Sequence, residues 1–294
     1  MVATGATFAI LNLFDYYSHH QSMMFVQLRC KKLLERNVIT KIIFILTYSI
    51  FIAVAFSQSS DKINANKVKS NDSDPQAIRI ADEVMNALGG KENWDNTHYI
   101  SWNFFGKRFH VWDKWNGNLR LQEKDLIVLI NLNTQTGRTW QNADEVTDAD
   151  SLSKILQHAY AAWINDSYWM FMPYKLKDPG VILHYKGEGV TTDGKSADIL
   201  QLTFEDVGLT PNNKYHVYVE KKSNLVIQFD YFQNANDDKP TIQAPWKDWK
   251  KYGNIMLSDD RGDRKMTDIA VFDKLPEVVF SDPEPVDIYK LIKK

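Results

Sequence analysis

The chain has few of the features that would point to thiol, metal or cofactor chemistry. Among its 294 residues there is a single cysteine, Cys30. One cysteine cannot form an intrachain disulfide, so no disulfide framework holds the fold. The sequence also has no H-E-x-x-H, no G-x-S-x-G, no P-loop and no G-x-G-x-x-G that opens a helix after a strand. We therefore expect a non-enzymatic protein with no catalytic residues, no metal and no cofactor.

The N-terminal apolar stretch is too short for a comfortable membrane span. Ile42–Phe56 has no charged residue and follows four basic residues between positions 31 and 41. As a helix it would measure about 22 Å, whereas the hydrocarbon core is roughly 30 Å thick. It ends in Ala55-Phe56-Ser57, a small-x-small pattern typical of signal-peptide cleavage. We predict export across the inner membrane into the periplasm, with cleavage after Ser57. An uncleaved tether formed by residues 39–57 is the alternative.

Three segments follow from this prediction. Residues 1–57 are an N-terminal extension plus signal peptide, residues 58–74 a polar, flexible leader, and residues 75–294 a single domain. The extension has no domain pattern, and a true start at Met23, Met24 or near Val38 would explain it. Cys30 precedes the apolar run, so it cannot be the modified cysteine of a bacterial lipoprotein.

The charge balance disfavours nucleic acid as a partner. Cleavage after Ser57 removes five of the 35 basic and two of the 37 acidic residues, which leaves a net charge of −5. Nucleic-acid binding needs a concentrated basic face.

The first element of the domain is a helix with clear boundaries. Asp74 suits the N-cap, Pro75 the first helical position, and Gly89 a left-handed C-terminal cap. Between them runs an apolar stripe at helical spacing: Ala77, Ile78, Ala81, Val84, Met85 and Leu88.

From Tyr99 onward the pattern changes to short strands. The predicted segments are Tyr99–Phe105, Lys107–Trp115, Asn118–Lys124, Leu126–Asn133 and Arg138–Gln141. Asn116-Gly117 is a strong signal for a type I′ hairpin turn, in which both central residues take positive φ. Consecutive strands joined by tight turns predict an antiparallel meander.

Helical spacing returns in mid-chain and strands then resume. We predict a helix from Asp148 to about Ile164, an interruption at residues 165–167, and a short helix from Ser167 to Met172. Further strands are expected at Val181–Gly187, Ser196–Phe204, Lys214–Lys221 and Leu225–Gln233, with weaker signals at Asn254–Leu257, Met266–Phe272 and Val278–Ser281.

Two groups of polar residues could form ion-binding sites. His110, His184 and His216 could converge across a sheet, but they lack metal-ligand spacing, so ordinary structural histidines are the preferred interpretation. The acidic stretch Asp259–Asp263, which contains Arg-Gly-Asp, lacks the alternating ligands and final Glu of an EF-hand. We expect a solvated, self-paired turn there.

Aromatic residues are more numerous than a core of this size requires, with 15 Phe, 13 Tyr and 9 Trp. Alternation puts Trp102 and Phe104 on one face of the first strand, and His110 and Trp112 on one face of the second. Strands with large apolar side chains on both faces are either covered by other elements on both sides or curved around an apolar core or ligand. Helices that fill the core are the alternative to a ligand cavity. The predicted ligand-binding residues are Trp102, Phe104, Trp112, Leu156, Trp163 and Trp169.

The order of elements resembles a known superfamily. The stretches that carry the resemblance are A-D-E-V-M-N-A-L-G-G-K-E-N-W (Ala81–Trp94), W-D-K-W-N-G (Trp112–Gly117), M-P-Y-K-L-K-D-P-G-V (Met172–Val181) and G-L-T-P-N-N-K-Y (Gly208–Tyr215). They are similar to a group of secreted bacterial proteins of the Lol-type superfamily, which includes lipoprotein carriers and their receptors. The resemblance implies an antiparallel, incomplete β-barrel (a half-barrel, mainly β) with helices in or over its concave side and an apolar cavity. Lipoprotein carriers hold the lid with an arginine near the start of the meander, and Arg108 is the nearest candidate.

The function predicted from all this is non-catalytic binding of a lipid, a lipoprotein acyl chain or another apolar ligand in the cell envelope. Burying a sixteen-carbon chain could contribute at most about 12 kcal/mol, so apolar walls alone would suffice. We expect a monomer that binds the acylated ligand and meets other envelope proteins. A ligand-free interaction or sensor module on the same scaffold is the alternative, and a hydrolase of envelope material is a third hypothesis.

Overall fold

The computed structural model describes residues 72–205, 210–284, 286, 287 and 290, which all lie within Asn71–Lys294. The predictions about secretion, the leader and Cys30 concern residues 1–71, apart from the last three leader positions, and lie outside the described residues. None of the described helices has both the length and the hydropathy needed to cross a membrane.

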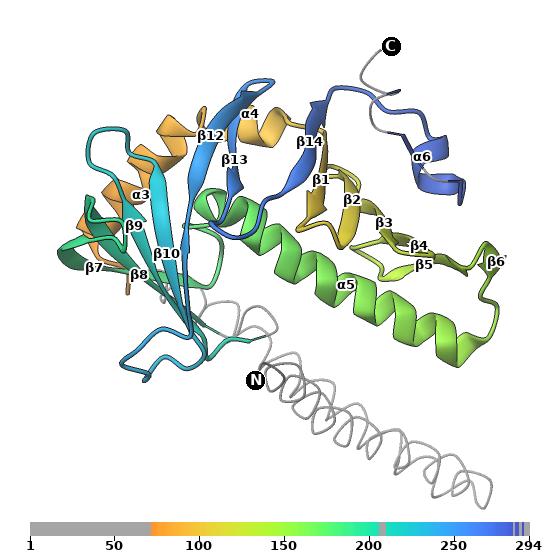
Figure 1. Cartoon of the computed structure of the whole chain (residues 1–294), viewed down its shortest axis with the longest axis horizontal. Coiled ribbons are helices and arrows are strands. Elements are labelled where there is room, and N and C mark those ends of the chain that lie inside the picture. Colours follow the sequence, from red (N-terminus) through yellow and green to blue (C-terminus); the bar gives the residue numbers. More distant parts are fainter. Residues whose placement is uncertain (1–71, 206–209, 285, 288–289, 291–294) are drawn as a thin grey trace, which may run out of the picture. The chain divides into compact units, whose positions relative to one another are not determined.

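Strands β1 to β6 and the late strand β14 build a seven-stranded antiparallel sheet (Figure 1). Its order is β14-β1-β2-β3-β4-β5-β6. The strands are β1 (Tyr99–Phe104), β2 (Arg108–Asp113), β3 (Asn118–Glu123), β4 (Leu126–Asn131), β5 (Thr136–Gln141), β6 (Asp144–Glu145) and β14 (Thr267–Phe272). The meander prediction is confirmed for β1 to β5. The return of β14 to the outer edge of β1 is a long-range pairing that local sequence does not indicate.

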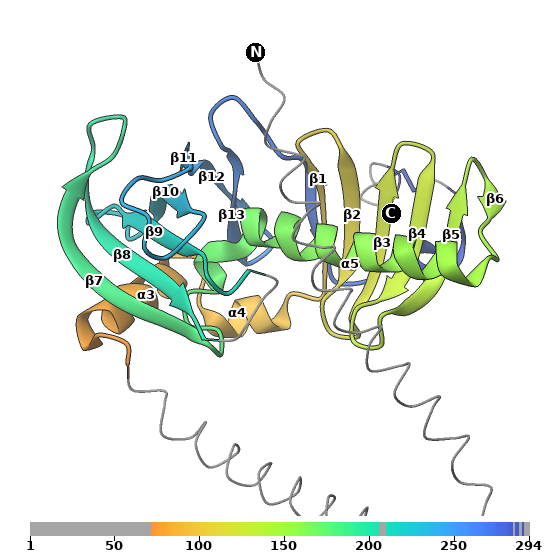
Figure 2. The same cartoon turned by 90° about the horizontal axis from the view of Figure 1, so that it is seen from below.

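A second antiparallel sheet has the order β11-β10-β9-β8-β7, and a hairpin joins β12 to β13. The strands are β7 (Val181–Val190), β8 (Ser196–Phe204), β9 (Lys214–Val219), β10 (Val226–Phe232), β11 (Ile242–Pro245), β12 (Lys247–Tyr252) and β13 (Ile255–Asp260). The hairpin lies between the two larger sheets (Figures 1 and 2), where the Trp249 indole nitrogen donates to the Val226 carbonyl at 2.9 Å. The sheets curve without closing into a barrel, which confirms the half-barrel prediction.

Helices cover the concave side of this curve. They are α3 (Pro75–Ala87), α4 (Lys91–Asn96), α5 (Ala149–Phe171) and a 3₁₀ turn (Met172–Tyr174), whereas α6 (Val278–Ser281) lies on the other side of the first sheet (Figure 1). Helix α5 contacts β4 and β5 and then reaches β13, so it crosses from one sheet toward the other (Figure 2).

The period of α5 explains this placement. Leu156, Ala159 and Ala162 lie on one face, since residues three or four apart stack along a helix. That face packs on buried residues of the concave side of β3 and β4, which are Leu119, Leu121, Val128 and Ile130. A larger cluster joins α3 and the end of α5 to strands of both sheets, with Ala77, Val84, Met170 and Phe171 among its buried members. Full burial contributes about 1.5–3 kcal/mol for each large apolar side chain, so α5 is firmly held.

Helix α3 begins at Pro75 as predicted, but Asp74 does not cap it through its side chain. The Asp74 carboxylate instead accepts from the backbone N–H of Tyr185 at 2.8 Å, which ties the start of α3 to β7. Gly89 has φ +110, as predicted for a residue just past a helix end. A side chain there would also meet the Asn254 carbonyl oxygen at 2.4 Å.

Three local predictions are wrong. The helix is continuous through residues 165–167, because Asp166 is buried and hydrogen-bonded to β2 rather than ending the helix. Val278–Ser281 is a helix and not a strand. Asn116-Gly117 is not a type I′ turn, because only Gly117 takes positive φ. Asp113 accepts from the Asn116 N–H and so holds residues 114–116 in a capped helical turn.

A turn with positive φ at both central residues does occur one hairpin earlier. Phe105 has φ +52 and Gly106 φ +70, and the Lys107 N–H donates to the Phe104 carbonyl at 3.0 Å. Because Phe104 pairs with Arg108, residues 105–107 form a three-residue connection between β1 and β2.

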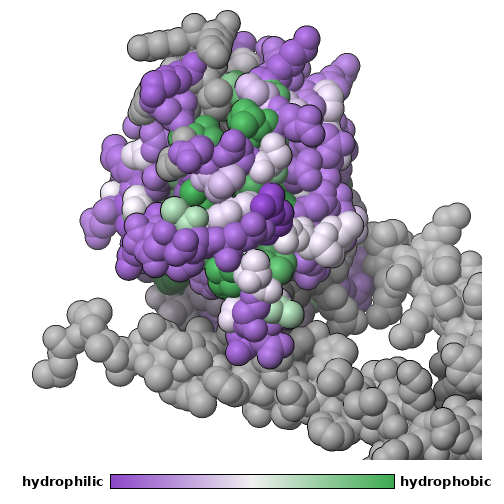
Figure 3. All heavy atoms as spheres, turned by 90° about the vertical axis from the view of Figure 1, so that its right-hand side faces the viewer, coloured by the Kyte–Doolittle hydropathy of each residue, from purple (hydrophilic) through white to green (hydrophobic). Residues whose placement is uncertain are grey.

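The convex side of the first sheet is covered by the segment after β14. Buried Arg120 of β3 donates to four backbone carbonyls of that segment, those of Val279, Asp282, Pro283 and Glu284. Burial lowers the pKa of Arg120 to about 10. From the α6 and β6 end, the visible surface is mainly hydrophilic, with hydrophobic side chains showing between hydrophilic ones (Figure 3).

Candidate functional site

A cavity of about 610 Å³ lies between the C-terminal half of α5 and the five-stranded sheet. Of the 21 described residues that line it, nine are aromatic, namely Tyr160, Trp163, Tyr168, Trp169, Phe204, Tyr215, Phe229, Tyr231 and Trp246. Helix α5 supplies the first four, and strands of the five-stranded sheet supply the next four. The cavity exists because α5 presents two faces: one packs on β3 and β4, and the other is turned to the second sheet.

Two of the six predicted ligand-binding residues line this cavity. They are Trp163 and Trp169, both on α5 and both half-buried. Trp169 meets Phe229 of β10 edge-to-face, with ring centroids 4.9 Å apart. Ligand contact by Trp163 and Trp169 stays a prediction.

The other four predicted residues lie in packed core and not among the cavity-lining residues. Trp102 is fully buried, stacked on His110 at 4.5 Å. Phe104 is buried against Phe105. Trp112 packs edge-to-face on Trp163, with ring centroids 5.5 Å apart. Leu156 belongs to the cluster between α5 and the first sheet. Ligand contact by these residues stays a prediction.

Sequence reasoning missed the sheet wall, which includes Phe204, Tyr215, Phe229 and Tyr231. Part of the signal was present, because alternation places Phe229 and Tyr231 on one face of β10. The missing information was which strands lie opposite α5. That depends on the strand order of the five-stranded sheet and on the path of α5 across it. The local sequence pattern predicts neither of these.

The lining is electrically neutral. Lys175 and Asp178 are its charged members among the described residues, and they form an ion pair of 2.6 Å. Burial raises the pKa of Tyr168 well above its usual value, and burial also raises that of Tyr215 and Tyr231. These phenols are therefore uncharged at neutral pH.

A polar group lies on the sheet side. Asn213 is buried and lines the cavity, and its side-chain N–H donates to the Thr210 hydroxyl at 2.7 Å. Hydrogen bonding from the Asn213 amide partly opposes the raised pKa of Tyr215 and Tyr231. Asn213 and the two phenols thus line the same cavity.

A buried ionic cluster fixes α5 to the first sheet. The Arg108 guanidinium donates two hydrogen bonds to the Asp166 carboxylate, at 2.6 and 2.8 Å, and the His110 ring lies 2.8 Å from the same carboxylate. Burial acts to raise the pKa of Asp166, but the bonds from Arg108 and His110 outweigh it and the pKa is lowered. Burial lowers the pKa of His110. Arg108, the predicted lid arginine, thus binds the helix that walls the cavity.

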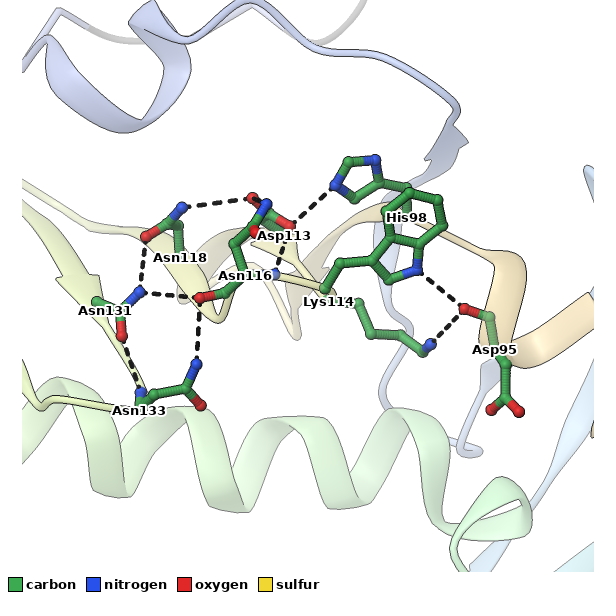
Figure 4. A network of polar contacts seen from close by, with 9 residues as sticks. Asp95, His98, Asp113, Lys114, Asn116, Asn118, Asn131 and Asn133 are labelled. Atoms are coloured by element: carbon green, nitrogen blue, oxygen red, sulfur yellow. Dashed lines mark hydrogen bonds and ion pairs between the residues drawn. The ribbon is translucent and has the colours of Figure 1, made fainter.

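A second polar network closes the end of the first sheet (Figure 4). The Asp113 carboxylate accepts from Asn116 and Asn118 and lies 3.1 Å from the His98 ring. Asn131 donates to the Asn116 carbonyl at 2.9 Å and so joins two neighbouring loops. Because these groups satisfy one another, the network holds loops in place.

The three histidines that could form an ion-binding site lie apart in the structure. His110 binds Asp166, His184 lies near Asp74, and His216 lies near Gln201 and Phe232, so the three do not converge. Across the described part of the chain, no three His, Cys, Asp or Glu side chains group closely enough to hold a metal ion.

The acidic stretch at residues 259–263 is a turn paired with lysines. Asp259 pairs with Lys250 at 2.8 Å, and Asp260 pairs with Lys265 at 3.2 Å. Arg261 is buried over the Trp246 ring, 3.5 Å from its centroid, and therefore does not present an exposed Arg-Gly-Asp.

No protein-family model matches the sequence, and the search of curated proteins finds no match. Among solved structures, the chain is similar to a DUF1329 family protein from Desulfovibrio piger ATCC 29098. That match has 14% identity and a TM-score of 0.37, and covers 72% of this chain and 100% of the other. The chain is also similar to MucB, solved in complex with MucA(peri), at 13% identity and a TM-score of 0.20 over 55% of each chain. Neither similarity assigns a family or a function.

Proposed function

We propose that this chain is a non-catalytic binding protein of the cell envelope, which holds a lipid or another apolar ligand in the cavity beside α5. The cavity itself carries the proposal. Its volume of about 610 Å³ falls within the roughly 300–1,000 Å³ of small-molecule sites. Its lining is mainly apolar and aromatic, with few polar groups, as is typical of such sites.

Apolar burial suffices to hold such a ligand. A molecule that buries about 300 Å² of apolar surface gains about 7 kcal/mol from leaving water. Loss of translational and rotational freedom offsets part of this gain. Since the walls are already formed, little further energy is spent on ordering side chains.

The lining does not favour catalysis. No histidine lies among the described lining residues, and Lys175 and Asp178 pair with each other. The Ser167 hydroxyl donates to the Ile164 carbonyl at 3.2 Å. None of these groups forms a nucleophile and base pair, which supports a binding role.

The resemblance to Lol-type proteins and the predicted N-terminal export signal support a periplasmic setting and an acylated or otherwise lipidic ligand. Other envelope proteins would then be partners that deliver or receive this ligand. These assignments are part of the proposal.

Titration of the full-length protein with a fluorescent fatty-acid analogue tests it. Trp163→Glu places a carboxylate against the ligand, so binding should be lost while circular dichroism shows a folded protein. Trp115→Glu is the matched control, because Trp115 is 56% exposed and lies outside the cavity. The control should bind like wild type.

A second variant covers the case in which Trp163→Glu unfolds. Ile242 lines the cavity from edge strand β11 and is 37% exposed, so Ile242→Glu should fold. It should also weaken binding. Folded variants that bind as tightly as wild type would remove the cavity from the binding site. A wild-type protein that binds no apolar probe would refute the proposed function and favour a ligand-free interaction module.

A further inference from the structure

The charges around the cavity restrict the chemistry of its occupant. Lys175 and Asp178 neutralise each other across 2.6 Å, and the other described lining residues carry no charge at neutral pH. An anionic head group taken into the cavity would meet no unpaired cation among the lining residues, since Arg261 is buried against the Trp246 ring and is not part of the lining. Burying an unpaired charge is strongly unfavourable. The part of the ligand inside the cavity is therefore uncharged.

The aromatic rings of the walls interlock edge-to-face. Phe229 meets Trp169 at an interplanar angle of 84° and Trp246 at 76°, and Phe204 meets Tyr215 at 89°. In such edge-to-face contacts each ring blocks the rotation of the next. Methionine, the side chain that best reshapes around flexible ligands, occurs once in the described lining, as Met172.

A stiff aromatic wall favours a rigid ligand over a flexible chain. A ring system keeps its shape on binding, whereas an acyl chain loses rotational freedom at many bonds. Ring faces also gain contact energy with aromatic side chains beyond the area they bury.

The polar end of the cavity supplies donors to an uncharged oxygen. Asn213, Tyr215 and Tyr231 all line the cavity, and the ring centroids of Tyr215 and Tyr231 lie 5.2 Å apart. Each phenol carries an O–H that can donate a hydrogen bond to a ligand oxygen. A carbonyl or hydroxyl oxygen on the ligand would accept it.

We infer that the ligand is a neutral lipid with a rigid ring system that carries a carbonyl or hydroxyl group, and not a fatty acid or a phospholipid. This inference rests on the proposed function, because it specifies the occupant of the same cavity. The ring lies between the aromatic faces of α5 and the sheet, and its oxygen points to Tyr215 and Tyr231.

Calorimetric titration of the full-length protein with three probes tests the inference. The probes are a monoprenylated 1,4-naphthoquinone (neutral, ring), monopalmitoylglycerol (neutral, chain) and palmitate (charged, chain). The quinone should bind about tenfold more tightly than either chain. Palmitate or monopalmitoylglycerol binding as tightly as the quinone would overturn the inference and leave the proposed function intact. Absence of binding by all three would overturn both.

Two variants test the polar and charged parts separately. Tyr231→Phe removes one phenol and should weaken quinone binding about threefold to tenfold. Tyr185→Phe is its control, because that hydroxyl donates to Asp198, outside the cavity lining. Asp178→Asn leaves Lys175 unpaired and should strengthen palmitate binding about threefold without changing quinone binding. Quinone binding unchanged in Tyr231→Phe, or palmitate binding unchanged in Asp178→Asn, would contradict the assignment.

Discussion

Replacing Asp166 with alanine should destabilise the domain more than any exposed substitution on α5. The Asp166 side chain is fully buried and receives two hydrogen bonds from Arg108, at 2.6 and 2.8 Å. The His110 ring lies 2.8 Å from the same carboxylate and is itself buried. Asp166→Ala leaves both partners without this carboxylate.

The expected loss of unfolding free energy depends on the contacts that Arg108 and His110 retain in Asp166→Ala. Removing one member of a buried ion pair typically costs about 3–5 kcal/mol. Arg108 retains Glu123 at 3.6 Å and is 16% exposed, so water and that carboxylate recover part of its loss. The His110 ring is fully buried, so water does not compensate for the lost contact with Asp166. We therefore expect a loss near the lower end, about 3 kcal/mol.

Urea unfolding at pH 7, followed by tryptophan fluorescence, measures this loss. With a slope of about 2–3 kcal/mol per M, the midpoint should fall by about 1–1.5 M. Asp150→Ala is the matched control, because Asp150 is an exposed carboxylate on the same helix, and its midpoint should stay within about 0.3 M of wild type.

A double variant separates the ion pair from other effects. Arg108→Met combined with Asp166→Ala removes both members, so its cost should be less than the sum of the single costs by about 1–3 kcal/mol. An Asp166→Ala midpoint equal to that of Asp150→Ala would refute the reasoning, as would strictly additive single and double costs.

The other predictions concern a turn and a buried histidine. Gly117→Val should cost about 1–3 kcal/mol, because Gly117 has φ +76 and a Cβ there would meet the Asn133 amide nitrogen at 2.6 Å. Gly106→Val has a similar φ but open space around it, so its midpoint should fall less, and equal midpoints would show that the clash is absent. Stability should fall as the pH drops below about 6.5, since the unfolded state then takes up a proton at His110 while the folded state, with its lowered pKa, does not. His110→Gln should flatten the slope between pH 7.5 and 5.5, and an unchanged slope would assign it to other groups such as His216, whose pKa burial also lowers.

The helix α3 and the strands of the meander could be predicted because their signals are local. Pro75 begins α3, Gly89 follows it with positive φ, and breaks at glycine or polar pairs separate β1 to β5. The face assignment of Trp102, His110 and Trp112 also holds, since alternation along a strand is fixed by backbone geometry.

Other features depended on tertiary contacts. Residues 165–167 have turn composition, yet the partners of Asp166 on β2 keep the helix intact. Asp113 caps the turn at residues 114–116 and overrides the Asn-Gly signal. The sheet wall of the cavity required the order of strands β7 to β11. The sequence pattern could thus predict the meander and the helices, and the resemblance implied the half-barrel, but of the cavity lining only residues on helix α5 were predicted.

The pairing of β1 with β14 has a consequence for how the chain is assembled. The Ser101 hydroxyl donates to the Asp268 carbonyl, across 167 positions of sequence. During synthesis, β1 emerges well before β14, so it must wait for more than 160 further residues before its outer neighbour arrives. Such long-range pairing slows folding and prolongs the exposure of an unpaired edge. A chain released or trimmed before Thr267 would offer that edge to a strand of another molecule, so aggregation rather than simple unfolding is the failure expected of C-terminal truncation.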